Sequence, residues 1–214
     1  MEFHLPEPIR NLKDFFYHLG IVTLGILIAL GLEQIVEAHH RAKIGRSSAD
    51  SFRSELTDNR GRVNEILASL PKSRAQIEAE IAKVSALGDA AAKLPVPIDY
   101  PDVHFLLMSS AAWDTAIAIQ ALYYIPAEDA KRFSRAYGAF RLFMDEERTG
   151  LAAWQDLRRF GDDAGVLSPV QRRDFIEQLH RYESYTHVVE MIGRGTLQDC
   201  QAALSAPAAA GAAP

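Results

Sequence analysis

The chain has 214 residues, a formal net charge of −5 at pH 7 and an isoelectric point near 5.8. This acidic balance argues against a nucleic-acid partner, because such partners normally require a basic surface. The one cysteine, Cys200, excludes an intramolecular disulfide framework. The chain is long enough for one domain with its own apolar core in addition to a membrane segment.

The most apolar segment covers residues 15–32 and contains no Asp, Glu, Lys or Arg. As a helix it would be roughly 27 Å long, which matches the hydrocarbon thickness of a bilayer. The pattern therefore predicts a transmembrane helix over residues 15–36, after an N-terminal flank of residues 1–14. A signal peptide cleaved near Ala29 to Gly31 is the competing interpretation.

Lysine and arginine residues on the two sides of this segment are nearly balanced and do not fix its orientation. Arg10 and Lys13 precede it, whereas Arg41, Lys43 and Arg46 follow it. A very short leading segment usually stays in the cytoplasm. We therefore expect residues 33–214 on the periplasmic side of the inner membrane, with the cytoplasmic side as the alternative.

Apolar residues continue at heptad spacing beyond the membrane segment. No proline interrupts residues 9–70, so the helix is expected to continue out of the membrane. Steps of three and four residues define a seam with one polar member, of the kind that fixes register at a cost in stability. The seam packs either against a second copy of the chain or, as we prefer, against a neighbouring helix of the same chain. It comprises Phe52, Leu56, Asn59, Val63, Ile66 and Leu70.

Prolines and caps divide the remaining chain. A break between Leu70 and Pro71 predicts a second helix over residues 72–94, antiparallel to the first. Three prolines in residues 94–101 predict an extended connector. Further helices are expected over residues 103–125, from Pro126 to about residue 157, and from a capping box at Ser168 to about residue 204.

The expected fold class is all-α, with an N-terminal transmembrane helix that continues into a helical bundle of about four to five helices. The extramembrane domain covers residues 37–205. Residues 206–214, APAAAGAAP, have no large apolar side chain to pack, and they are expected to be a disordered tail.

The pattern Glu-x-x-His occurs twice, as Glu37 with His40 and as Glu177 with His180. This spacing puts a carboxylate and an imidazole on one helix face, as in di-iron and di-manganese four-helix bundles. Two solvated helix faces, with Glu37 paired to Arg41, explain the same residues without a metal. We prefer that interpretation, so no cofactor is predicted.

A metal site would need two further glutamates, for which Glu55 and Glu147 are the candidates. The sequence shows no Ser-His-Asp arrangement, no glycine-rich phosphate loop and no Cys/His metal spacing. A non-enzymatic role is therefore favoured, with no catalytic residue assigned.

Asp114 stands in the apolar run AAWDTAIAIQAL. A carboxylate there must be capped, paired or exposed, because an unpaired buried carboxylate would neutralise. We expect a bond to a helix end or to Arg135 or Arg141. The alternative is a ligand pocket walled by the aromatic residues Trp113, Tyr123, Tyr124 and Trp154.

The stretch VTLGILIALGLEQIVEAHHRAK, followed by SELTDNR, resembles the N-terminus of a family of uncharacterised bacterial proteins. These proteins carry a GILIAL-type membrane helix, a polar segment and an E-x-x-x-N turn of helix. The resemblance covers about 45 of the 214 residues and extends to the Ala-Trp-Asp-Thr-Ala element. It implies a single-pass membrane protein with a helical extramembrane domain, and it assigns no activity.

These observations favour a membrane-anchored helical module that binds a partner or assembles with itself. Gly25 and Ala29 form a pair of small residues that lets two spans approach closely. The expected partners are the lipid bilayer and either a second copy of the chain or another membrane protein. A metal-binding bundle enzyme and a ligand-sensing domain remain the alternatives.

Overall fold

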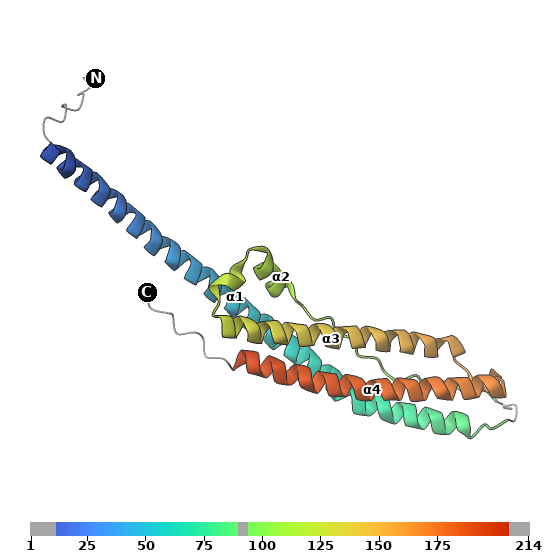
Figure 1. Cartoon of the computed structure of the whole chain (residues 1–214). Helices are drawn as coiled ribbons and strands as arrows, with labels where there is room; N and C mark the ends of the chain where they lie inside the picture. The colour runs from blue at the N-terminus through green and yellow to red at the C-terminus, as the bar shows by residue number, and fades with distance from the viewer. Residues whose placement is uncertain (1–11, 90–93, 206–214) are drawn as a thin grey trace.

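The computed structural model describes residues 12–89 and 94–205. Residues 1–11 of the expected flank and the expected tail of residues 206–214 lie outside the described residues. The described part confirms the predicted fold class, a long N-terminal helix followed by a helical bundle (Figure 1). Its helices are α1 (Leu12–Ser85), α2 (Ala111–Ala118), α3 (Ala127–Leu157) and α4 (Pro169–Leu204), with short 3-10 turns η1 (Ala121–Tyr124), η2 (Arg158–Phe160) and η3 (Ala164–Val166).

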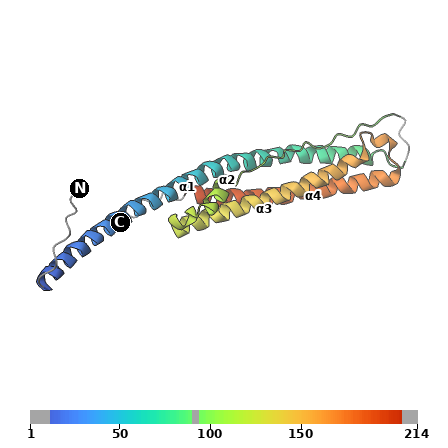
Figure 2. The same ribbon diagram turned by 90° about the horizontal axis from the view of Figure 1, so that it is seen from above.

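Three long helices form the bundle. α1 and α3 run in the same direction, and α4 runs antiparallel to both (Figures 1 and 2). The N-terminal part of α1 projects beyond the bundle. We call the end from which α1 projects the span end, and the opposite end the far end. Residues 94–110, here called the strap, return in extended form along the bundle from the far end to α2.

The core follows continuous heptads on α1 and α4. From Gly45 to Val84 on α1, each buried position lies three or four residues after the previous one, and α4 shows the same spacing from Arg172 to Ala203. This spacing keeps one stripe of each helix facing its neighbours, as in coiled coils. Large aromatic side chains fill the space between the stripes, among them Phe52, Phe133, Tyr137, Phe143 and Phe175.

The predicted break between Leu70 and Pro71 is wrong, because α1 continues through Pro71 to Ser85. Pro71 lies on the exposed face, so its ring does not displace the buried positions on either side of it. A proline inside a helix costs about 3 kcal/mol. Burial of a large apolar side chain contributes about 1.5–3 kcal/mol, and Ile66 and Ile77 on the two sides of Pro71 are both fully buried. The heptad therefore outweighs the proline, and no antiparallel hairpin forms.

The predicted helix over residues 103–125 is also wrong. The strap stays extended as far as Ser110, and only α2 and η1 are helical in this range. Polar side chains of α1 bind the strap backbone and so replace the hydrogen bonds that a helix would supply. The predicted extended connector, the capping box formed by Ser168 with Gln171, and the end of the last helix at Leu204 are confirmed.

Candidate functional site

The projecting part of α1 contains the apolar segment of residues 15–32, which carries no Asp, Glu, Lys or Arg. Its most apolar window has a mean hydropathy of 2.1, and none of that window is buried. By its length and composition, α1 is the one helix among the described residues that could span a membrane. Gly25 and Ala29 lie on this exposed segment, and a Cβ added to Gly25 would meet nothing within 4 Å.

All six seam residues, from Phe52 to Leu70, lie in the core of the chain itself. The Phe52 ring packs against Trp113, Phe133 and Tyr137 at centroid distances of 5.4, 5.1 and 5.8 Å. The seam therefore packs within the chain, as the preferred alternative expected, but its partners are α2, α3 and α4 instead of residues 72–94.

The two Glu-x-x-His pairs lie at opposite ends of the molecule. Glu37 precedes the first buried position of α1, whereas Glu177 lies near the start of α4 at the far end (Figure 1). Glu37 accepts a hydrogen bond from Arg41 at 2.7 Å, which confirms the predicted pair, and Glu177 accepts one from Arg181 at 2.5 Å. Residues 12–89 and 94–205 contain no group of three or more His, Cys, Asp or Glu arranged to hold a metal.

Glu55 and Asn59, one helical turn apart on α1, hold the end of the strap. Asn59 Nδ2 donates to the Ser109 carbonyl at 2.7 Å, and the Ser109 amide donates to Asn59 Oδ1 at 3.0 Å. The Glu55 carboxylate accepts from Ser109 Oγ at 2.5 Å and from the Ala112 amide at 3.1 Å. It thereby binds a backbone amide at the first turn of α2.

A tyrosine from α3 completes this group of residues. Tyr137 OH donates to Glu55 Oε1 at 2.7 Å, and burial, together with this bond to a carboxylate, raises the pKa of Tyr137. The Glu55 and Asn59 pair is the E-x-x-x-N element that the sequence singled out. Its contacts are with the strap, α2 and α3 of the same chain, so its role in the described residues is to fix the bundle.

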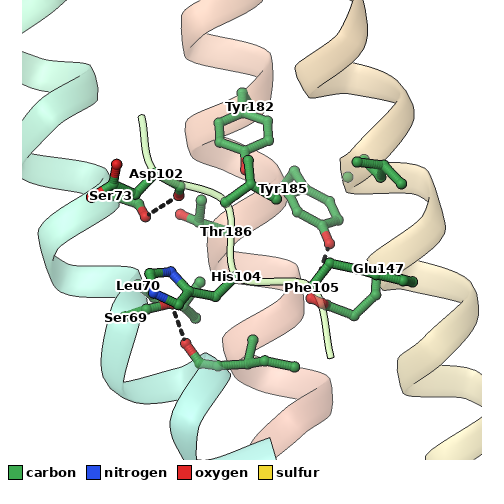
Figure 3. A pocket seen from close by; sticks show the side chains of 14 residues that line it. Ser69, Leu70, Ser73, Asp102, His104, Phe105, Glu147, Tyr182, Tyr185 and Thr186 are labelled. Carbon is green, nitrogen blue, oxygen red and sulfur yellow. Dashed lines mark hydrogen bonds between the residues drawn. The ribbon is translucent and has the colours of Figure 1, made fainter. Parts of the chain in front are cut away.

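The middle of the bundle has a small, partly open pocket of about 20 Å³, enough for one water molecule. Figure 3 shows Glu147 of α3 facing Tyr185 of α4, and the strap residues Val103, His104 and Phe105 also line this pocket. Tyr185 OH donates to Glu147 Oε1 at 3.3 Å, and Glu147 is only 7% exposed. Burial raises the pKa of Glu147 to about 7, and the bond from Tyr185 opposes this shift in part.

An open groove of about 960 Å³ lies at the span end, between the α2 to η1 turn and the start of α3. Two of the four aromatic residues proposed to wall a pocket, Trp113 and Tyr123, line it. Trp154 lies elsewhere, where its Nε1 donates to the Pro101 carbonyl at 3.1 Å. Asp114 is exposed in the first turn of α2, as one of the expected outcomes required, and accepts a bond from Ser110 Oγ at 2.8 Å. Its partner is therefore Ser110, directly before α2, and the expected bond to Arg135 or Arg141 is wrong.

Arg172 was not anticipated from the sequence as a buried residue. It occupies a heptad position of α4, is 4% exposed, and donates to the carbonyls of Gly88 at 3.0 Å and of Ala164 and Gly165 at 3.3 Å. These bonds join the turn after α1 to η3 at the far end. A charged residue at a heptad position was the available signal.

No protein-family model, no curated protein and no solved structure matches the chain. What the described residues offer is a long exposed apolar helix, a rigid bundle fixed by buried polar contacts, and an open apolar groove at the end nearest to that helix.

Proposed function

We propose that the chain is a single-pass membrane protein whose bundle acts as an interaction or assembly module. The observation that carries this proposal is the exposure of the apolar part of α1. Eighteen residues, 15–32, carry no Asp, Glu, Lys or Arg, and the most apolar window of this helix has no contact with the bundle that would bury it. Such a surface in water would be strongly unfavourable, and a lipid bilayer is the solvent that it fits.

The second support is the continuity of α1. Its 74 residues form one helix of about 111 Å. Residues 37–44 join the membrane segment to the bundle without a loop, and the Glu37 to Arg41 salt bridge lies in this joint. Because no flexible linker intervenes, a change in the tilt or rotation of the span would be passed directly to the bundle.

The membrane that we propose is the bacterial inner membrane, with the bundle on the periplasmic side. The support is the resemblance of residues 22–43 and 54–60 to bacterial single-pass proteins with a GILIAL-type helix. The numbers of basic residues before and after the membrane segment are nearly equal, so they do not favour either orientation.

Assembly would use surfaces other than the heptad seam, because the seam is already buried within the chain. Gly25 and Ala29 are the surface that we propose for contact between two spans, since small residues let helix backbones approach closely in lipid. A different membrane protein with small residues on its own span is the other partner of this kind.

The proposal is tested by purifying the full chain in a mild detergent and measuring the mass of the complex. We expect a mass above that of one 23.7 kDa chain plus bound detergent, from a second copy or a co-purifying membrane protein. Gly25→Leu combined with Ala29→Leu is expected to lower it to that of one chain, whereas Leu24→Ile, a matched change in the same span, is not. A strict monomer with no co-purifying protein would contradict the assembly role.

A ligand-sensing role is the second candidate, and the groove lined by Trp113 and Tyr123 favours it. A metal-binding enzyme has no comparable support, because Glu37 with His40 and Glu177 with His180 do not meet. Screening small apolar compounds for a rise in the unfolding temperature of the full chain tests the sensing role. A compound that binds the groove should raise the unfolding temperature of the unmodified chain but not that of Trp113→Phe. If no compound behaves in this way, the sensing role is contradicted.

A further inference from the structure

We propose that the turn joining α2 to α3 rests on the lipid headgroups of the membrane that holds α1. We call residues 117–124 the tip. This inference rests on the proposed membrane anchor and adds a second, peripheral contact with the same bilayer. It assigns a lipid surface as the partner of the apolar groove at the span end.

The tip exposes large apolar and aromatic side chains that the core does not use. Ile117 is 50% exposed, Ile119 57% and Tyr123 84%. They adjoin the groove, whose lining includes Trp113 and other apolar residues. At the tip Gln120 adopts a left-handed conformation, with φ of 56°, and this residue reverses the chain between α2 and η1.

Contacts with α1 place the tip on the side of the bundle nearest to the span. Glu55 binds the first turn of α2, whereas the Tyr124 carbonyl lies directly against Gly45. The start of α2 therefore lies beside Glu55 of α1, whereas the end of η1 lies beside Gly45, which is ten residues nearer to the membrane segment. Figure 1 shows α2 and the tip beside the point where α1 leaves the bundle.

The distance to the bilayer is short. Gly45 lies 13 residues beyond Leu32, the last residue of the charge-free segment, which is about 20 Å along the helix. The headgroup region occupies roughly 5–8 Å on each side of the hydrocarbon. Tyr123 extends outward from the tip, and membrane helices are tilted by about 20° on average. A tilt of α1 toward α2 would bring the tip closer to the headgroups.

The chemistry of the tip suits an interface. Tyrosine is enriched at membrane surfaces because its ring is apolar and its hydroxyl is polar. Lys131 and Arg135 line the groove, with Lys131 Nζ paired to Glu128 at 2.8 Å, and Lys43 and Arg46 of α1 lie near the same level. Basic groups at this height attract anionic headgroups.

A lipid surface fits this patch better than a protein does. A stable protein interface buries about 800 Å² on each partner, whereas the tip presents only a few large apolar side chains. The unbroken helix α1 holds the tip next to the bilayer at all times. Because the tip and the membrane are already joined in this way, even a small contact is enough for the tip to stay on the bilayer.

The test uses the full chain at one copy per nanodisc of phosphatidylcholine and phosphatidylglycerol. A spin label is attached to one new cysteine at a time: Leu24→Cys in the span, Tyr123→Cys at the tip, or Val166→Cys at the far end, where Val166 is 78% exposed. The unmodified chain is the background, because Cys200 is fully buried. Collision rates with oxygen, which prefers lipid, and with a nickel chelate, which prefers water, give a ratio for each site.

We expect a high ratio at Tyr123→Cys, several-fold above that at Val166→Cys and below that at Leu24→Cys. Adding Ile117→Asp and Ile119→Asp should lower the ratio at the tip to the far-end value, whereas Val170→Asp at the far end should leave it unchanged.

The inference would be overturned if the ratio of oxygen to nickel collisions were equal at Tyr123→Cys and Val166→Cys while it stayed high at Leu24→Cys. The proposed membrane anchor would then remain intact. A label at Tyr123→Cys that is shielded from both reagents would show a protein cover and would also overturn the inference. An aqueous reading at Leu24→Cys would overturn the anchor and the inference together.

Discussion

Asn59 of α1 and Ser109 of the strap exchange two hydrogen bonds, in which the Asn59 side chain takes the place of a neighbouring backbone strand. The side chain of Asn59 is completely buried. An extended segment packed against helices has no partner strand for its backbone groups, so side chains must satisfy them. This pair explains how the strap remains extended up to the residue at which α2 begins.

Replacing Asn59 should therefore destabilise the bundle strongly. Asn59→Ala leaves the part-buried Ser109 amide and carbonyl without their partner, which predicts a loss of about 1–3 kcal/mol in the free energy of unfolding. Denaturant titration in detergent, followed by tryptophan fluorescence, measures it. Asn64→Ala, at an exposed position of the same helix, is the control and should change stability by less than about 0.5 kcal/mol. Equal effects of the two changes would contradict a structural role for the pair.

Gly45 is required by the close approach of η1 to α1. A Cβ at this position would collide with the Tyr124 carbonyl oxygen, which belongs to the backbone and cannot move aside cheaply. Gly45→Ala should therefore destabilise the bundle by about 1–3 kcal/mol. Gly61→Ala is the matched control, since nothing lies within 4 Å of its added Cβ.

The control should act in the opposite direction. Alanine is a better helix former than glycine by about 0.5–1 kcal/mol, so Gly61→Ala should stabilise the chain by about that amount. Thermal unfolding of both variants in the same detergent decides the matter. A stabilising Gly45→Ala would mean that η1 does not lie against α1 as described.

Glu147 should make stability depend on pH. Its pKa rises from an ordinary value of 4.5 to about 7 in the folded state, because burial disfavours the charged form. Between these values the folded chain holds a proton that the unfolded chain releases. Stability from this group is therefore greatest below pH 4.5, falls as the pH rises to 7, and remains low above it.

Glu147→Gln should remove this dependence. Relative to the unmodified chain, the variant should gain roughly 1–3 kcal/mol in the free energy of unfolding between pH 4.5 and pH 8. Glu65→Gln, at an exposed position of α1, is the control and should show no such gain. Parallel pH profiles for the chain and for Glu147→Gln would contradict the raised pKa.

The orientation of the bundle can be read from one exposed cysteine. Glu78 lies on the exposed face of α1, whereas the native Cys200 is buried and should not react. Burial also raises the pKa of Cys200 to about 11, which keeps it in the unreactive thiol form. A periplasmic bundle predicts that Glu78→Cys reacts with a membrane-impermeant maleimide in intact cells. Reaction only after the inner membrane is opened would place the bundle in the cytoplasm.

Periodicity predicted the larger features of the fold correctly. The apolar segment, the heptad seam and the capping box at Ser168 each depend on residues close in sequence, and all three appear in the structure as helices with the expected faces. The polar member of the seam, Asn59, was also recognised as special, although its partner was not.

Pro71 and the strap show where local reasoning fails. Proline disfavours a helix locally, but the heptad on both sides of Pro71 is satisfied only if α1 continues. The strap residues 103–110 have helical character by composition, yet side chains of α1 from distant positions hold them extended. Neither outcome depends on neighbouring residues alone, and so the sequence pattern could not predict it.

The candidate surfaces were only partly predictable for the same reason. Trp113 and Tyr123 meet at one groove because α2 and η1 turn at Gln120, a residue whose left-handed backbone conformation is uncommon outside glycine. Trp154 is 41 positions beyond Trp113 in the chain, and it does not line the groove. It packs against the strap instead, where its Nε1 donates to the Pro101 carbonyl.

We propose that the exposed part of α1 lies in a bilayer. The most direct measurement is extraction of cell membranes with alkaline carbonate, comparing the full chain with a variant that carries both Leu24→Arg and Ile28→Arg. Each arginine at the middle of a span costs about 2.5–3.5 kcal/mol, and the bundle does not contact either position. We expect the full chain to stay in the membrane pellet and the variant to be released. Release of the unmodified chain, or its recovery without residues 1–31, would contradict it.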